Sequence, residues 1–221
     1  MNYLKNKTAL VTGASSGIGF EIVKYLSRFD MQIIITARRE EKLLKLKEEV
    51  ESNSNSNVIV IAKDLAKPNS PQEIYDFCQS KNYKIDFLVN NAGYGFTDDF
   101  HSYDLDKLDD FLNVLLNSVV KLTRLFLEDM KERKSGKILQ VSSIAGIIPS
   151  GSGAIGIYGN IKNFVNEFTI TLNSTYKKFN VHVCALCPGF TETGFNERAG
   201  FNMQYSDVPS LFLMSAKQVA E

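Results

Sequence analysis

Tyr158 and Lys162 stand four residues apart in a stretch whose apolar pattern predicts a helix, which places both side chains on one face. A tyrosine phenol has an ordinary pKa of about 10, too high for efficient proton transfer near neutral pH. A neighbouring ammonium favours the phenolate and so lowers that pKa. A phenol and an ammonium at this spacing could therefore act together as a general acid or base.

The spacing by itself is a weak signature. Tyr3 with Lys7 and Tyr103 with Lys107 show the same separation. For any of these pairs the alternative is an ordinary contact on a helix surface. The choice among them depends on the motifs and elements that surround each pair.

A glycine-rich segment, Thr12–Gly19 (TGASSGIG), lies between the first predicted strand and the first predicted helix. Such a turn lets the backbone approach a pyrophosphate, which then sits at the N-terminus of the helix. The alternative is that Gly13, Gly17 and Gly19 only tighten the turn, since a glycine turn alone is weak evidence. Its place directly after a strand and before a helix favours a dinucleotide cofactor.

The end of the second predicted strand indicates which dinucleotide. A site for NAD(H) usually has an acid there to bind the ribose 2′-hydroxyl, but this chain has Arg38 and Arg39. A guanidinium binds a 2′-phosphate through charge-assisted hydrogen bonds. The alternative is that both arginines are solvated charges, although cations are disfavoured at the start of a helix. The sequence therefore favours NADP(H) over NAD(H).

The composition is that of an ordinary globular domain, with 44% hydrophobic and 23% charged residues among 221. Lysine plus arginine and aspartate plus glutamate number 25 each, so the net charge gives no reason to expect nucleic acid or a membrane as partner. The polar N-terminus does not resemble a signal peptide, and no apolar run could span a bilayer. We expect a cytoplasmic protein.

Cys184 and Cys187 form a C-x-x-C motif, which could indicate a metal or redox site. Their segment reads as a strand, however, where residues three apart point to opposite faces. A second pair of ligands is also absent from the sequence. The pattern favours cysteines packed in the core and predicts no metal site.

Short β-branched runs alternate with long amphipathic segments along the chain, which requires crossovers and predicts a parallel sheet covered on both faces. The fold class is α/β, a Rossmann-like doubly wound parallel sheet with helices on both faces. The predicted strands are Thr8–Thr12, Gln32–Ala37, Val58–Ala62, Phe87–Asn90, Lys137–Val141 and Val181–Leu186. The predicted helices are Ile18–Arg28, Glu40–Val50, Pro71–Lys81, Leu105–Glu132 and Ile157–Lys178.

No linker or repeat divides the chain, so we expect a single domain over residues 1–221 with a substrate lobe at about 190–215. The polar tract Glu51–Asn57 is interpreted as a surface turn. Ser215 and Gln218 form a capping-box signature for a further helix, and the chain ends at Glu221 before two turns are complete. We therefore expect that the sequence is truncated at its C-terminus.

Five motifs in order make the chain resemble the short-chain dehydrogenase/reductase family along essentially its whole length. They are TGASSGIG, then Asn90–Gly93 (NNAG) after the fourth strand, Ser142–Ser143 after the fifth, Tyr158–Lys162 (YGNIK), and Pro188–Gly189 after the sixth strand. Together they are far more specific than any one of them.

The resemblance implies a role for each matching residue. Tyr158 would be the general acid in reduction and the base in oxidation, and Lys162 would hold the nicotinamide ribose and bias the phenol. Ser143 would position the substrate carbonyl, with Ser142 as the fallback. Asn117 matches the family's asparagine in a water-mediated proton relay, and a satisfied buried amide is the alternative.

The cofactor would likewise be bound by residues at matching positions. Arg38 corresponds to the residue that binds the 2′-phosphate, and Arg39 is a weaker candidate. Asp64 and Leu65 fall at the adenine pocket, although Asp64 could simply be an Asx-turn residue. The pyrophosphate turn, the adenosine-ribose flank and the carboxamide site would comprise Gly13, Ser15, Ser16, Gly17, Ile18, Gly19, Asn90, Ala92, Gly93, Pro188, Gly189 and Thr191.

Two departures from the family pattern stand out. Ser143 lies 15 residues before Tyr158, where about thirteen is usual, and Ser150–Gly153 offers a place for two extra loop residues. The residues before the lysine are Asn160 and Ile161 in place of the usual small residue and serine. These changes leave the spacing of the Tyr–Lys pair intact.

The resemblance implies an oxidoreductase that interconverts a carbonyl and an alcohol with NADP(H). Phenylalanines between Gly189 and Phe212 would form a lid that favours an apolar ketone, aldehyde or acyl substrate, or they could pack a core. The alternative class is a redox sensor or scaffold that binds NADP(H) without turnover. Relatives form homodimers or homotetramers through the two longest helices, so we expect the same here.

Overall fold

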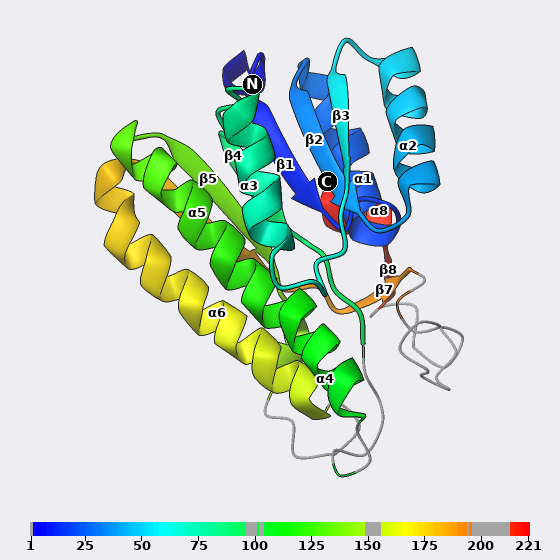
Figure 1. Ribbon diagram of the computed structural model, residues 1–221, viewed down its shortest axis with the longest axis vertical. Helices are drawn as coiled ribbons and strands as arrows, with labels where there is room; N and C mark the ends of the chain where they lie inside the picture. The colour runs from blue at the N-terminus through cyan, green and yellow to red at the C-terminus, as the bar shows by residue number, and fades with distance from the viewer. Residues whose placement is uncertain (1, 96–100, 102–103, 149–155, 194, 196–212) are drawn as a thin grey trace.

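The computed structural model describes residues 2–95, 101, 104–148, 156–193, 195 and 213–221 (Figure 1). Six parallel strands form one sheet in the order β3-β2-β1-β4-β5-β6. The order reverses between β1 and β4, and ligands bind at such a switch point in doubly wound sheets. The strands are β1 (Thr8–Thr12), β2 (Gln32–Ala37), β3 (Asn57–Ala62), β4 (Phe87–Asn90), β5 (Gly136–Val141) and β6 (Val181–Leu186).

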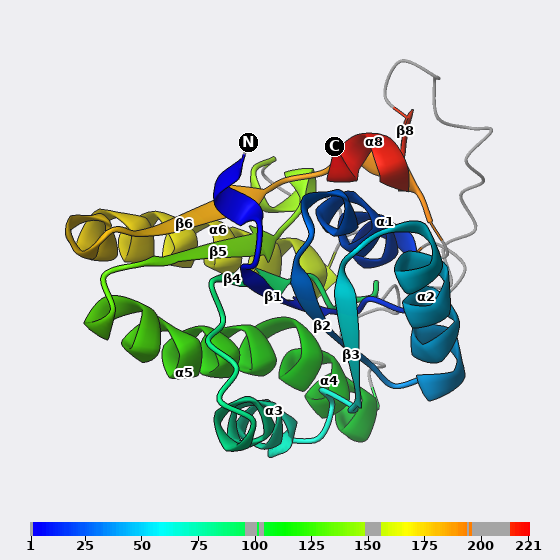
Figure 2. The same ribbon diagram turned by 90° about the horizontal axis from the view of Figure 1, so that it is seen from above.

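Helices cover both faces of this sheet, which confirms the predicted fold class. Figure 2 shows α1 and α8 on one side of the strands and α3 and α5 on the other. The principal helices are α1 (Gly17–Leu26), α2 (Glu40–Asn53), α3 (Ser70–Ser80), α4 (Leu105–Leu112), α5 (Ser118–Glu132), α6 (Gly156–Tyr176) and α8 (Ala216–Ala220).

Successive side chains of the central strands point alternately into two separate apolar cores, one on each face of the sheet. In β1, Leu10 joins a cluster with Ile74 of α3 and Phe126 of α5. Its neighbours Ala9 and Val11 instead join a cluster with α1 and α2. Successive residues of a strand point to opposite faces, and a sheet buried on both sides therefore needs apolar residues at nearly every position.

The long helix predicted from Leu105 to Glu132 is not a single α-helix. A π-helical turn, η4 (Asn113–Asn117), separates α4 from α5. The backbone N–H of Ser118 donates to the carbonyl of Asn113, five residues earlier. The Ser118 hydroxyl also donates to the Val114 carbonyl, at 2.7 Å. A turn of this kind frequently marks a functional site, and this one adjoins the pocket described below.

The turn predicted at Glu51–Asn57 begins later than expected, because α2 continues to Asn53. In the last turn of α2, polar side chains donate hydrogen bonds to backbone carbonyls four residues earlier. The Ser52 hydroxyl donates to the Glu48 carbonyl at 2.7 Å, and the Asn53 amide to the Glu49 carbonyl at 2.7 Å.

The chain after β6 forms a second, two-stranded parallel sheet of β7 (Phe190–Glu192) and β8 (Leu213–Ser215). The capping box predicted at Ser215 and Gln218 is confirmed and begins α8. Most of the segment between Gly189 and Phe212, where a lid is expected, lies outside the described residues, as does Ser150–Gly153.

The prediction that the C-x-x-C cysteines pack in the core is wrong for Cys184, which is exposed. β6 is the edge strand of the sheet, where Val181 and Val183 are buried and the alternate residues face outward. Cys187 follows the strand and is half-buried, and its thiol lies 3.4 Å from Asn166 Oδ1. Among the described residues, no His, Cys, Asp or Glu cluster could hold a metal, and no helix is long and apolar enough to cross a bilayer.

Candidate active site

A pocket of about 890 Å³ opens at the carboxyl ends of the strands. It brings together the glycine turn after β1, the arginines after β2, the segment after β4, the serines after β5 and the Tyr–Lys pair of α6. Sequence-predicted residues in its wall are Gly13, Ser15, Ser16, Gly17, Ile18, Arg38, Arg39, Asp64, Leu65, Ala92, Gly93, Ser142, Ser143, Tyr158, Lys162, Pro188, Gly189 and Thr191.

Tyr158 and Ser143 face each other at the inner end of this pocket. Burial raises the pKa of the Tyr158 phenol to about 12, and its hydrogen bond with the Ser143 hydroxyl opposes that rise. The phenol is therefore protonated at neutral pH in the cofactor-free protein. A protonated phenol next to a hydroxyl can bind a carbonyl oxygen from two sides and give it a proton.

Lys162 is buried, with 6% of its surface exposed. Its ammonium donates to the Val141 carbonyl at 2.8 Å and lies 5.6 Å from the centre of the Tyr158 ring. Burial lowers the pKa of the Lys162 amine to about 8, because the charged form loses its hydration. The Lys162 amine is therefore expected to gain or lose its proton close to neutral pH. Its charged form would favour the phenolate of Tyr158 beside it.

The structure separates the roles of the two serines that follow β5. The buried Ser142 donates its hydroxyl to the Lys162 carbonyl at 3.0 Å and so ties the strand to α6. The Ser143 hydroxyl accepts the backbone N–H of Ala145 at 3.1 Å and bonds the phenol. Ser143 is accordingly the better candidate of the two for contact with a bound molecule, whereas Ser142 supports the helix that carries Lys162.

Phe195 packs edge-on against the Tyr158 ring, with centroids 5.6 Å apart. It is one of the aromatic residues expected to form a lid. Other apolar side chains in the same part of the pocket wall are Ile144, Ile148 and Phe190, all substantially exposed. The space beside the phenol is therefore bounded largely by apolar groups.

Two glycines of the cofactor turn have backbone conformations that favour glycine. Gly13 has φ +68°, and a Cβ there would lie 2.8 Å from the Ala92 Cα. Gly17, the first residue of α1, has φ +61°. Gly19 does not line the pocket, because it packs behind the turn against the Asn91 side chain and the Gly13 carbonyl. The first N–H groups of α1, which have no acceptor within the helix itself, suit an anion.

A clamp between β1 and β4 holds this turn in place, and the sequence analysis missed it. The Thr12 hydroxyl accepts the backbone N–H groups of Asn91 and Ala92, at 2.9 and 3.0 Å. The Asn91 amide donates back to the Thr12 carbonyl at 2.9 Å. The signal was present in the NNAG motif, of which Asn90, Ala92 and Gly93 were expected at the cofactor and Asn91 was given no role.

The end of the pocket at β2 is positively charged. Arg38 and Arg39 are both exposed in its wall, and neither forms an ion pair with any described residue. Asp64 also lines the wall, and its carboxylate accepts the Ala66 N–H at 3.1 Å, which is the Asx turn considered above. The two guanidinium groups are therefore available for an anionic ligand.

Besides Gly19, two predicted site residues lie outside the pocket wall. Asn90 is buried and donates its amide to Thr123 Oγ1 and Gln140 Oε1, both at 3.0 Å, so it joins β4 to β5 and α5. Asn117 is exposed, and its amide donates to the Asn113 side chain at 2.9 Å. Neither side chain lines the pocket that holds Tyr158 and Lys162.

Of the π-turn residues, Val114 lines the pocket, and the fully buried Leu115 lies next to Gly93. A Cβ on Gly93 would lie 3.9 Å from Leu115 Cγ and 4.0 Å from the Lys162 ammonium, so the three residues meet at one point. Tyr94 also lines the pocket and packs edge-on against Phe111, with ring centroids 5.4 Å apart. Burial, with a smaller contribution from Asp110, raises the pKa of the Tyr94 phenol. No sequence motif pointed to Leu115 or Tyr94.

Comparison with known proteins places this geometry in a family. The model of the short chain dehydrogenases matches residues 7–203. A very-long-chain 3-oxoacyl-CoA reductase of Anas platyrhynchos is 34% identical over 84% of this chain, and a probable NADP-dependent dehydrogenase of Haemophilus influenzae is 32% identical over 84%. The chain spans 60% of the length of the first of these relatives and 72% of the second.

Solved structures show the same fold. A short-chain dehydrogenase from Sphingobium yanoikuyae in complex with NADPH superposes with a TM-score of 0.89 at 24% identity, covering 97% of this chain and 81% of that one. The L-sorbose reductase of Gluconobacter frateurii, complexed with NADPH and L-sorbose, gives 0.85 at 24% identity, covering 100% and 89%. With the family model matched over residues 7–203, the chain belongs to the short-chain dehydrogenase/reductase family.

Proposed function

We propose that this protein catalyses the reversible NADP(H)-dependent reduction of a carbonyl to an alcohol, with Tyr158 as the general acid. The observation that carries the proposal is the environment of the Tyr158 phenol. The phenol is hydrogen-bonded to Ser143, and the centre of its ring lies 5.6 Å from the Lys162 ammonium. This group occupies the same pocket as the glycine turn and Arg38.

The residues of the pocket fit a dinucleotide phosphate. The N-terminus of α1 and the hydroxyls of Ser15 and Ser16 would hold the pyrophosphate, and Arg38 would bind the 2′-phosphate, with Arg39 beside it. Ala92, Gly93, Asp64 and Leu65 would border the adenosine. The NADPH complexes among the structural neighbours and the NADP-dependent relative support the choice of NADP(H) over NAD(H).

When bound, NADPH supplies a hydride to the carbonyl carbon. The Ser143 hydroxyl and the Tyr158 phenol orient the carbonyl oxygen, and the phenol gives that oxygen its proton as negative charge develops there. The Lys162 ammonium stabilises the phenolate that remains. Asn117 has no part in this proposal, because its side chain is exposed and bonded to Asn113.

The apolar wall formed by Ile144, Ile148, Phe190 and Phe195 favours an apolar ketone, aldehyde or acyl substrate. The 3-oxoacyl-CoA reductases among the relatives agree with such a preference. We further propose that residues 1–221 act as a single domain with the substrate lobe at 190–215. Exposed Phe164 and Ile170 on α6 support a homodimer or homotetramer.

The test is NADPH oxidation over a panel of apolar ketones, aldehydes and 3-oxoacyl thioesters. Tyr158→Phe is expected to lower turnover about 100-fold or more and to leave NADPH affinity near that of the wild type. Tyr83→Phe, at the far end of the sheet, is the matched control and should change neither. If Tyr158→Phe leaves turnover unchanged, the catalytic assignment is wrong. If wild-type protein binds NADPH but reduces no compound of the panel, a non-catalytic cofactor-binding function is the better proposal.

A further inference from the structure

The fold gathers positive charge at the end of the sheet opposite the pocket. The four segments that enter β1, β4, β5 and β6, residues 2–7, 81–86, 131–137 and 177–182, carry ten lysine and arginine residues and two carboxylates, a net charge of +8. The rest of the chain is correspondingly −8, so the overall neutrality conceals this separation. We call these segments the basic end. Its cations are Lys5, Lys7, Lys81, Lys84, Lys131, Arg133, Lys134, Lys137, Lys177 and Lys178.

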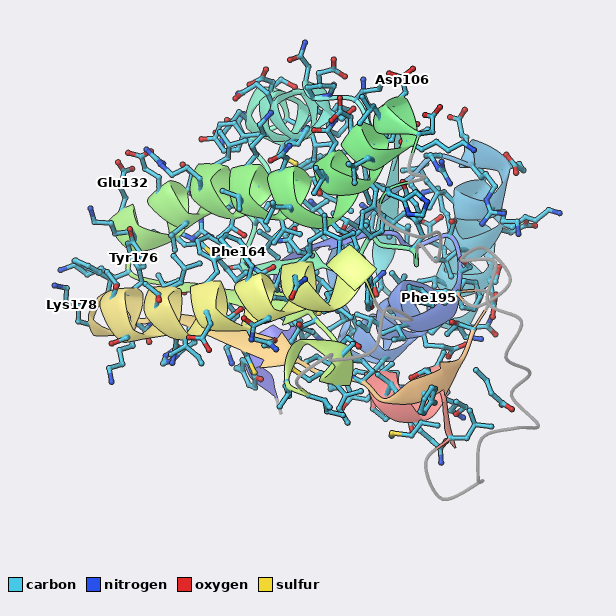
Figure 3. All side chains as sticks on the ribbon, turned by 90° about the horizontal axis from the view of Figure 1, so that it is seen from below. Asp106, Glu132, Phe164, Tyr176, Lys178 and Phe195 are labelled. Atoms are coloured by element: carbon cyan, nitrogen blue, oxygen red, sulfur yellow. The ribbon has the colours of Figure 1, made fainter. Side chains whose placement is uncertain are left out.

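Tight turns bring the four segments together. Each contains one residue in the left-handed region, at φ between 51° and 62°, which reverses the chain just before a strand. The Asn180 amide donates to the Lys134 carbonyl at 3.0 Å and joins two of the segments directly. Figure 3 shows Glu132, Tyr176 and Lys178 at one end of the molecule, with Phe195 at the other. The left-handed residues are Asn6, Asn82, Lys134 and Asn180.

Most of these charges are exposed and uncompensated. Only two ion pairs involve the basic end among the described residues, Lys5 with Asp30 and Lys7 with Asp86. Lys81, Lys84, Lys134 and Lys177 are exposed, and none of them forms an ion pair with a carboxylate in the part of the chain that the structure describes. The two segments that enter β2 and β3 along the same edge, residues 27–31 and 51–56, carry a net charge of −1. The positive charge is therefore confined to one half of the edge.

From this distribution we propose that the basic end binds the surface of an anionic lipid bilayer. Lysine acts as a flexible, hydrated point charge and suits diffuse attraction to a charged plane, whereas fork-like recognition of phosphates in nucleic acids relies on arginine. Arg133 is the only arginine of the set. Its guanidinium already donates to the Ser135 carbonyl at 3.0 Å and to the Ile85 carbonyl.

Two further features suit a lipid surface. Tyr3, 59% exposed, lies under the Lys137 ammonium, 4.5 Å from the ring centre, and an amphipathic ring of this kind is favoured at the level of lipid headgroups. A hollow of about 420 Å³ between the segments is lined by Lys7, Lys84 and Arg133, and by Asp86, whose carboxylate is engaged by Lys7. Such a hollow could receive a lipid phosphate.

The placement has a consequence for substrate access. The pocket opens at the carboxyl ends of the strands and the basic end lies at their amino ends, so a protein docked on a bilayer would keep its pocket free. Binding would thus be compatible with the activity proposed above but would not depend on it.

The experiment is sedimentation of the full chain with vesicles of phosphatidylcholine alone or with about 30% phosphatidylserine. The variant carries Lys81→Gln, Lys84→Gln, Lys177→Gln and Lys178→Gln. At about 1 kcal/mol for each lysine at a charged surface, partitioning onto the anionic vesicles should fall about 100-fold or more. Binding of the wild type should also weaken steeply with salt, because these charges are exposed.

The matched control removes the same charge elsewhere, with Lys42→Gln, Lys45→Gln, Lys67→Gln and Lys107→Gln, all exposed outside the basic end. It should partition like the wild type, and both variants should retain wild-type circular dichroism. The proposal is overturned if the wild type binds neutral and anionic vesicles equally or neither, or if the two variants lose binding equally. Tighter binding to a single-stranded or duplex oligonucleotide than to the anionic vesicles, at equal salt, would also overturn it.

Discussion

The Lys162 ammonium lies 5.6 Å from the centre of the Tyr158 ring and is held there by a 2.8 Å hydrogen bond to the Val141 carbonyl. The pair that a four-residue spacing suggested is thus fixed by contacts within the protein. The Lys162 amine is buried, and the free-energy cost of burying its charge lowers its pKa to about 8.

Replacement of Lys162 by methionine should reveal this lowered pKa in the free energy of unfolding. The unfolded chain keeps the proton up to the ordinary pKa of 10.5, whereas the folded chain releases it near 8. Between these values the unfolded state binds more protons, so the wild type gains stability as pH rises. The advantage of Lys162→Met over the wild type should therefore be largest at about pH 7 and shrink by about pH 10.

Urea unfolding of the cofactor-free proteins measures this difference. Lys45→Met, at an exposed position of α2, is the control and should show a difference that varies little with pH. A stability difference for Lys162→Met that is the same at both pH values would contradict the depressed pKa.

Loss of Arg38 should change which cofactor the protein prefers. The Arg38 guanidinium is exposed in the pocket wall at the end of β2, where a 2′-phosphate is expected. Hydrogen bonds to a charged group are worth roughly 1.5–3 kcal/mol, so Arg38→Ala should weaken NADPH about 10- to 100-fold. NADH, which lacks the phosphate, should lose little. Equilibrium binding measured by cofactor fluorescence decides the point, and an equal loss for both would exclude the phosphate role.

A methyl group at Gly146 should disturb the site through the backbone of α6. A Cβ there would lie 2.5 Å from the Lys162 carbonyl carbon and 2.6 Å from the Asn163 nitrogen, and neither backbone atom can turn aside. We expect Gly146→Ala to cost about 1–3 kcal/mol of stability and to lower kcat, because the helix must shift at Lys162.

Gly136→Ala provides the comparison. Its added Cβ would crowd the buried Met130 side chain, against Cγ and 2.7 Å from Cβ, at the end of the sheet away from the pocket. Thermal unfolding should show a loss of stability for Gly136→Ala as well, whereas steady-state kinetics should show an unchanged kcat. Equal effects of the two substitutions on kcat would mean that the contact with α6 has no special importance.

Asn117→Ala tests whether that side chain has any part in proton transfer. Because the amide is exposed and bonded to Asn113, we expect turnover to change less than about twofold, well below the contribution of a proton-transfer group. A tenfold or greater loss of kcat, with stability unchanged, would restore the relay role expected from the family resemblance.

The sequence was sufficient for the elements whose periodicity is strong. β1, β2, β4 and β6 have the predicted bounds, because each is an apolar run flanked by turn residues. The π-turn at Asn113–Asn117 could not be predicted, since one extra residue in a helical turn leaves the apolar pattern nearly unchanged. In this turn Val114 lines the pocket and Asn117 is exposed, which the apolar pattern does not indicate.

Side-chain partners were equally hidden from a motif reading. Ser142 and Ser143 are adjacent and identical in type. Only the hydrogen bond from Ser142 to the Lys162 carbonyl shows that Ser142 supports α6, which leaves Ser143 as the candidate for substrate contact. Asn90 and Asn91 present the same problem, because the first joins strands and the second clamps the glycine turn. Contacts between residues far apart in the chain decide each case.

Phe195 lies edge-on against one side of the Tyr158 ring. A ketone whose oxygen is held by Tyr158 and Ser143 would therefore present its two substituents to unequal surroundings, one of them bounded by this ring. Only one prochiral face of the carbonyl would then be open to attack, and the alcohol produced should be predominantly a single enantiomer.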